Sequence, residues 1–140
     1  MILKFEVIGN QENPKGNPIP YVRSTQRGQF KKNVVRYNRW KLWVLKCFYD
    51  LYPNHSPSVG GAPLFSGKIF ESSRKLKFRM GMMIHWANDA HADPDNVFKG
   101  IADALFSNDK YLAISGVDFC DASDGIGKVE ITIEILSEDA

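Results

Sequence analysis

Acidic side chains gather around one short predicted helix in the second half of this 140-residue chain. Asp93 precedes Pro94, a pair typical of a helix start, because Asp can accept hydrogen bonds from free N–H groups and proline fits the first helical position. Asp95, Lys99 and Asp103 then recur every four residues, which places them on one face of the predicted helix. Clustered carboxylates repel one another, and a bound hard cation is the usual reason that such a cluster is tolerated.

This acidic run resembles the signature of the RusA family of Holliday junction resolvases. The family pattern D-x-D-N-x-x-K-x-x-x-D-A-L is formed here by Asp93, Asp95, Asn96, Lys99, Asp103, Ala104 and Leu105. In that family a paired acidic step follows the helix, and its second Asp completes the metal site. Here the step reads Asn108-Asp109, so Asp109 matches the family and Asn108 departs from it.

The resemblance implies a catalytic site of four residues, namely Asp93, Asp95, Lys99 and Asp109. Its three carboxylates would hold Mg²⁺, with Mn²⁺ as a substitute, because Mg²⁺ takes a few carboxylates together with waters and phosphate oxygens. The cation would lower the pKa of an attacking water. Lys99 would neutralise charge on the phosphate or protonate the leaving oxygen through a water. Asn96 would orient a neighbouring carboxylate or the backbone. Asp103, two turns into the helix, would either support the metal ligands or have a structural role.

A plainer interpretation of the same residues is also open. Asp93 would only cap the helix, and Asp95 and Asp109 would be solvated. Lys99 would then form an i,i+4 pair with Asp95, a common helix-stabilising device worth about 0.3–0.5 kcal/mol.

A basic segment near the N-terminus resembles the family a second time. Residues 16–32, GNPIPYVRSTQRGQFKK, match a pattern of prolines followed by arginines and a glycine. Basic residues here are candidates for DNA phosphate contacts, which set affinity and its salt dependence. These candidates are Lys15, Arg23, Arg27, Lys31, Lys32 and Arg36. Without the resemblance, such a loop would be interpreted as a solvated surface loop.

The net charge of +2 conceals a polarised chain. Residues 1–86 carry 15 Lys and Arg against 4 Asp and Glu, whereas residues 87–140 carry 3 against 12. A basic half joined to an acidic half suits a polyanionic partner beside a cation-dependent site. Alternatively, the two halves neutralise each other across the fold.

Hydrophobic periodicity predicts four strands, near residues 1–9, 76–86, 111–119 and 129–135, and two helices, over 34–52 and after Asp93. The buried stripe of the second helix would be Val97, Ile101, Ala104 and Leu105. Segments 11–32 and 53–73 are expected to be loops. The last two strands are expected to pair as an antiparallel hairpin. This order predicts a single α/β domain over 1–140, a mixed β-sheet packed against two main helices, as in RusA-like proteins.

The remaining features favour a cytoplasmic protein. The sequence has no apolar run of about 20 residues, which a membrane-spanning helix needs, and MILKFEVIGN lacks the pattern of a signal peptide. Cys47 and Cys120 are the only cysteines, and they are expected to be reduced, buried thiols and not a disulfide framework. Trp40 and Trp43 are expected in the core or at a dimer interface. The resemblance makes a bacterial, phage or prophage origin plausible.

The expected function is that of a magnesium-dependent, structure-selective endodeoxyribonuclease in DNA recombination and repair. By resemblance, a homodimer would resolve four-way junctions by paired nicking. Two alternatives stay open: a nuclease of other branched DNA such as flaps, and a non-catalytic DNA-binding dimer.

Overall fold

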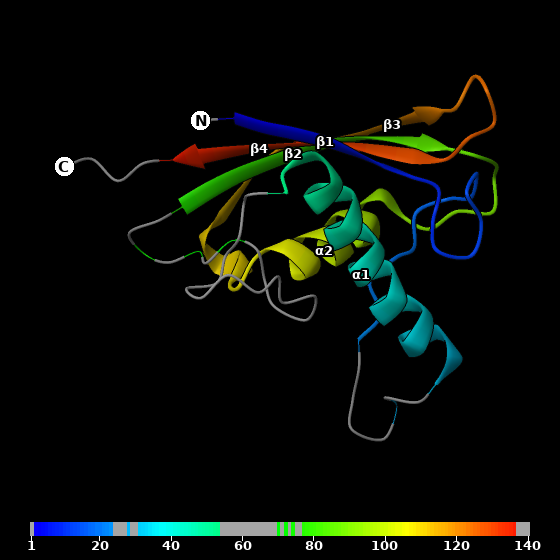
Figure 1. Cartoon of the computed structure of the whole chain (residues 1–140), viewed down its shortest axis with the longest axis horizontal. Helices are drawn as coiled ribbons and strands as arrows, with labels where there is room; N and C mark the ends of the chain where they lie inside the picture. Colours follow the sequence, from blue (N-terminus) through cyan, green and yellow to red (C-terminus); the bar gives the residue numbers. More distant parts are fainter. Residues whose placement is uncertain are drawn as a thin grey trace.

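A mixed four-stranded sheet forms one layer of the protein, and two helices form the other (Figure 1). The computed structural model describes residues 2–23, 28, 31–53, 70, 72, 74 and 77–136. Its elements follow the predicted order: β1 (Ile2–Ile8), α1 (Lys32–Leu51), β2 (Lys77–Trp86), α2 (Pro94–Leu105), the 3₁₀ turn η2 (Asp109–Tyr111), β3 (Leu112–Asp121) and β4 (Lys128–Leu136). The predicted α/β class is therefore confirmed.

The strands are ordered β1-β4-β2-β3. β4 pairs antiparallel with β1 and with β2, whereas β3 pairs parallel with β2. The predicted β3–β4 hairpin is wrong, because β2 lies between these strands. Residues 122–127 form a connection that passes the end of β2, and the Ala122 N–H donates to the Trp86 carbonyl across 2.9 Å. Six residues easily span two strand spacings, about 10 Å.

One face of the sheet and the facing sides of both helices form a single core. Alternate residues of β1 are buried, and the same alternation marks most of β2 and β4, as expected for strands with one covered face. Trp40 of α1 and Ile101 of α2 are fully buried. Figure 1 shows both helices on the same side of the sheet. The core prediction is thus confirmed for Trp40, while Trp43 is half-buried and packs against the core.

Strand β3 lies at the sheet edge, and the helices leave much of it uncovered. Its register against β2 shifts by one residue at Ser115. Side chains alternate between the two faces of a strand, so Ile114 and Val117, three positions apart, would otherwise lie on opposite faces. The extra residue at the shift places both on one face, and four apolar side chains of β3 then lie opposite the core-facing residues of β2. We call this set the β3 apolar face: Leu112, Ile114, Val117 and Phe119. Ile114 is 63% exposed and Phe119 is 59% exposed.

Most of the predicted loop at 53–73 lies outside the described residues. Neither helix in the described ranges has the length and apolar character needed to cross a membrane.

Candidate functional site

Helix α2 begins where the sequence predicts, but the carboxylate of Asp93 does not cap it. Asp93 occupies the N-cap position with an extended backbone, and its side chain makes no capping hydrogen bond. Its carbonyl oxygen instead accepts from the N–H groups of Asn96 (3.1 Å) and Val97 (3.2 Å). Pro94 at the first helical turn suits this start because its ring presets a helical φ. The Asp93 carboxylate is therefore exposed and available to other groups.

A pocket of about 320 Å³ between α2 and β3 brings together three of the four predicted catalytic residues: Asp95, Lys99 and Asp109. All three are exposed, so their charged ends face solvent. The remaining walls are apolar and consist of Phe98, Ala102, Leu112, Ile114 and Val117. Three side chains of the β3 apolar face, all but Phe119, thus form one side of the pocket, and the charged side chains line another part of it.

The connection from α2 to β3 holds Asp109 at this pocket. Ser72 Oγ donates to the Asn108 carbonyl (2.5 Å), and the Asn108 N–H lies 3.1 Å from the same hydroxyl. The Asn108 side chain accepts from the Lys110 N–H across 3.1 Å, which starts the 3₁₀ turn that Asp109 opens. Asn108, where the chain departs from the family pattern, therefore has a local structural role that its side-chain oxygen performs.

Lys99 contacts an aromatic ring that the sequence did not single out. Its Nζ lies 4.3 Å from the centroid of the Tyr21 ring, a cation–π contact, and no Asp95–Lys99 ion pair forms. Tyr21 is held beside α2 because its N–H donates to the Asn96 carbonyl across 3.0 Å. Gly100 permits this approach, since a Cβ there would lie 3.2 Å from the Tyr21 nitrogen. Asn96 thus supports the site through its backbone.

Asp103 connects the two helices and is not among the residues that line the pocket. Its carboxylate accepts a hydrogen bond from the Tyr37 hydroxyl (2.7 Å) and lies 3.3 Å from Lys41 Nζ, both on α1. Each four-residue step turns an α-helix about 40° past a full circle, so Asp103 points about 80° away from Asp95. Burial, together with the Asp103 carboxylate, raises the pKa of Tyr37.

The three predicted metal ligands are only partly gathered. Asp95 and Asp109 line the pocket, and Asp93 does not. Within the described ranges, no three Asp, Glu, His or Cys side chains form a group spaced to hold a metal ion.

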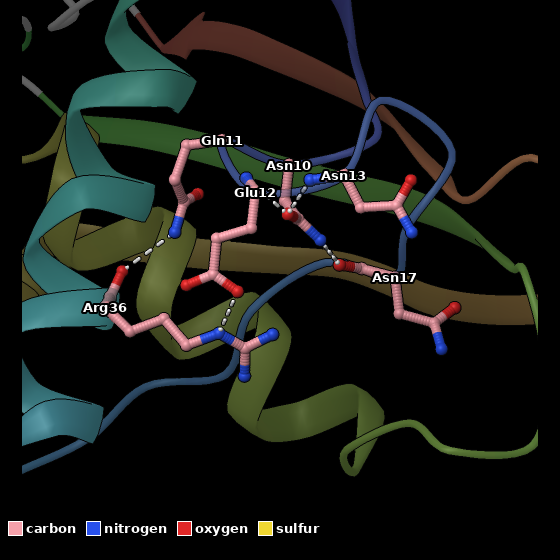
Figure 2. Close-up of polar contacts among 6 residues, drawn as sticks. All are labelled: Asn10, Gln11, Glu12, Asn13, Asn17 and Arg36. Carbon is pink, nitrogen blue, oxygen red and sulfur yellow. Dashed lines mark hydrogen bonds and ion pairs between the residues drawn. The ribbon is translucent and has the colours of Figure 1, made fainter.

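The predicted DNA-contacting residues divide into paired and unpaired groups. Arg36 Nε lies 2.9 Å from Glu12 Oε2, and the Gln11 side chain donates to the Arg36 carbonyl across 3.1 Å (Figure 2). Four other members are exposed and have no ion-pair partner within the described part of the chain: Lys15, Arg23, Lys31 and Lys32. Arg27 lies outside the described residues.

Two asparagines that the sequence analysis passed over order the approach to α2. Asn10 is buried, and its side-chain oxygen accepts from the N–H groups of Glu12 and Asn13 while its amide donates to the Asn17 carbonyl (Figure 2). Asn17 in turn accepts from the Ala87 N–H across 2.6 Å. The loop after β1 therefore fixes the segment that leads from β2 into the acidic motif. The sequence predicts a loop over residues 11–32, but no pattern in it indicated the distant partner Ala87.

Comparison with known proteins leaves the family open. No protein-family model matches this chain, and the search of curated proteins found no match.

Proposed function

We propose that this protein is a magnesium-dependent endonuclease that cleaves branched DNA in the manner of the RusA type. The observation that carries the proposal is the pocket where Asp95, Lys99 and Asp109 meet. Two carboxylates and one ammonium group at an open pocket are the residue types that phosphodiester hydrolysis requires: oxygen ligands for a hard cation and a positive charge for the phosphate.

The carboxylates fit the donor set of Mg²⁺, which proteins commonly hold through one or two carboxylates, with waters and substrate phosphate completing an octahedron. Asp95 and Asp109 would be these ligands. Asp93, the third predicted ligand, does not line this pocket, so the proposal assigns the cation to the other two carboxylates. Mg²⁺, or Mn²⁺ in its place, would supply a water of lowered pKa at the phosphate.

The other residues of the pocket would bind and orient the phosphate. The Lys99 ammonium group is exposed, and the Tyr21 ring restricts where it can lie. In the proposal it neutralises charge on the non-bridging phosphate oxygens as that charge grows. Four exposed basic residues, Lys15, Arg23, Lys31 and Lys32, would contact phosphates farther along the DNA.

A homodimer belongs to the proposal, because paired nicks on opposed strands need two sites. The β3 apolar face supports it: it lies on an edge strand and carries two strongly exposed large side chains, Ile114 and Phe119. Edge strands with exposed apolar residues favour pairing with another chain. An association through β3 would place the two pockets near the interface.

The choice of substrate is tested by comparing an immobile four-way junction, a flap and a linear duplex, each with Mg²⁺ and with EDTA. The proposal predicts Mg²⁺-dependent nicking of the junction in symmetric pairs and little cleavage of the duplex. Cleavage confined to the flap would favour a nuclease of other branched DNA. Junction binding without cleavage in Mg²⁺ or Mn²⁺ would contradict catalysis and leave a DNA-binding dimer.

A further inference from the structure

A cysteine, a histidine and a glutamate from three neighbouring strands meet on the sheet face opposite the helices. Cys120 Sγ of β3 lies 3.3 Å from His85 Nδ1 of β2. His85 Nε2 lies 3.4 Å from Glu130 Oε2 of β4. Cys120 and His85 are direct partners in the β2–β3 register, so the sheet itself holds the thiol beside the imidazole.

The histidine between the other two groups is restrained on both sides. Its Nε2 atom is buried and makes no hydrogen bond within the described structure, and the Glu130 carboxylate lies at ion-pair distance from it. Lys128 is the register partner of His85 on β4, and its Nζ lies 3.8 Å from the other Glu130 oxygen. Cys120 itself is exposed, so the expectation of two buried thiols is wrong for this cysteine, which lies on the uncovered face of an edge strand. A base oriented by a carboxylate beside an accessible thiol is the arrangement that activates a cysteine nucleophile.

We propose that Cys120 is a reactive thiol, activated by His85 and Glu130, and that it is a site of oxidation by peroxides. The site lies on the opposite face of the sheet from the pocket of Asp95 and Asp109, so the inference does not depend on nuclease activity.

The reaction balances with hydrogen peroxide as the oxidant. The Cys120 thiol gives its proton to His85 Nδ1, and Glu130 faces the imidazolium that results. The thiolate sulfur attacks one peroxide oxygen, the O–O bond breaks, and the leaving hydroxide takes the proton back from His85. The products are a sulfenic acid on Cys120 and one water, and sulfur is oxidised while peroxide is reduced.

The second cysteine provides an internal reference. Cys47 of α1 is half-buried, and burial raises the pKa of its thiol. A raised pKa leaves little thiolate at neutral pH, and the thiolate is the nucleophile. Cys47 therefore reports on the general access of reagents and on whether a variant has kept its fold.

The test exposes the whole chain to hydrogen peroxide with dimedone, which traps sulfenic acids, and follows each cysteine by peptide mass spectrometry. The variants are His85→Gln, Glu130→Gln and, as a matched control on β4, Glu134→Gln, whose carboxylate contacts Arg79 instead. We expect His85→Gln to slow the labelling of Cys120 about tenfold, as loss of an activating partner does. Glu130→Gln should slow the labelling of Cys120 less. Glu134→Gln should leave it unchanged, and the labelling rate of Cys47 should be the same in every variant.

An unchanged Cys120 rate in both His85→Gln and Glu130→Gln would overturn the proposal, since exposure alone would then explain the labelling. Labelling of Cys47 ahead of Cys120 in the wild type would overturn it as well. If His85→Gln fails to fold, the labelling rate of Cys120 in Glu130→Gln tests the proposal instead. That variant should fold, because the Glu130 side chain is 45% exposed.

Discussion

At the scale of single residues, the side chains of the acidic motif divide between two tasks. Asp95 and Lys99 line the pocket, whereas Asp103 bonds to Tyr37 and holds the two helices together. The motif placed all three on one helix face from their spacing. The eight-residue separation already implies about 80° of helix rotation between Asp95 and Asp103. The motif did not reveal that Tyr37 lies beside Asp103 or that Tyr21 lies beside Lys99, because neither tyrosine is close in sequence.

Replacing Lys99 with Met should remove the positive charge from the pocket while keeping most of the side-chain volume. We expect single-turnover cleavage of a four-way junction to fall about 100-fold, the size of effect seen when one group that stabilises transition-state charge is lost. Lys110→Met is the matched control, since Lys110 is exposed nearby and does not line the pocket. Equal activity of Lys99→Met and wild type would contradict the role given to this residue.

Replacing Tyr37 with Phe should lower the free energy of unfolding by about 1–2 kcal/mol, because the Asp103 carboxylate loses a hydrogen bond. The variant should also change the pH dependence. The pKa of Tyr37 is raised in the folded protein above its ordinary value of 10.0, so the unfolded chain loses this proton first as pH rises.

The contribution of Tyr37 to the free energy of unfolding is therefore fully present below pH 10.0 and declines above it. Urea titrations between pH 8 and 11 measure this, and the decline should be smaller in Tyr37→Phe. A decline of the same size in both proteins would show that Tyr37 does not contribute to it.

At the scale of elements, the sequence predicted the type and order of strands and helices well, because each has a clear hydrophobic period. The pairing of strands was less accessible. The turn-rich segment DASDGIGK is typical of a hairpin, yet its strands flank β2. The pairing of strands depends on how their apolar faces pack together against the helices. Local turn signals carry no information on that packing.

Gly127 lies in the connection that passes the end of β2, and its replacement by Ala tests this arrangement. A Cβ at Gly127 would lie 2.2 Å from the Gly16 carbonyl oxygen, so backbone must move. We expect the free energy of unfolding to fall by about 1–3 kcal/mol, as for other overpacked sites. Ser123→Ala, an exposed change in the same connection, should have almost no effect. Equal denaturation midpoints for the two variants would contradict the close approach.

At the scale of the whole molecule, the charge polarity of the chain is partly neutralised by folding. Lys41 pairs with Asp103 and Arg79 pairs with Glu134, so basic residues of the first half meet acidic residues of the second. Lys31 and Lys32, at the start of α1, have no ion-pair partner among the described residues and remain exposed to a polyanion. Composition alone could not separate these two groups, because the pairing is set by the sheet register and by helix packing.

Replacing Phe119 with Lys tests the proposed homodimer. The charged side chain would lie in the β3 apolar face. We expect sedimentation velocity to show dimers for the wild type and monomers for Phe119→Lys. The matched control is Ile2→Lys on the opposite edge strand, where the isoleucine is 58% exposed and Phe119 is 59% exposed. Dimers that persist in Phe119→Lys, or are lost in Ile2→Lys alone, would place the interface elsewhere.

The pocket between α2 and β3 is most directly tested by the cleavage of a four-way junction in Mg²⁺ by Asp95→Asn, Asp109→Asn and Asp118→Asn. Asp118 is an exposed carboxylate on β3 that does not line the pocket. The proposed function predicts that the first two variants bind the junction but lose Mg²⁺-dependent nicking by about 100-fold or more, while Asp118→Asn cleaves like the wild type. Full cleavage by Asp95→Asn or Asp109→Asn would contradict it.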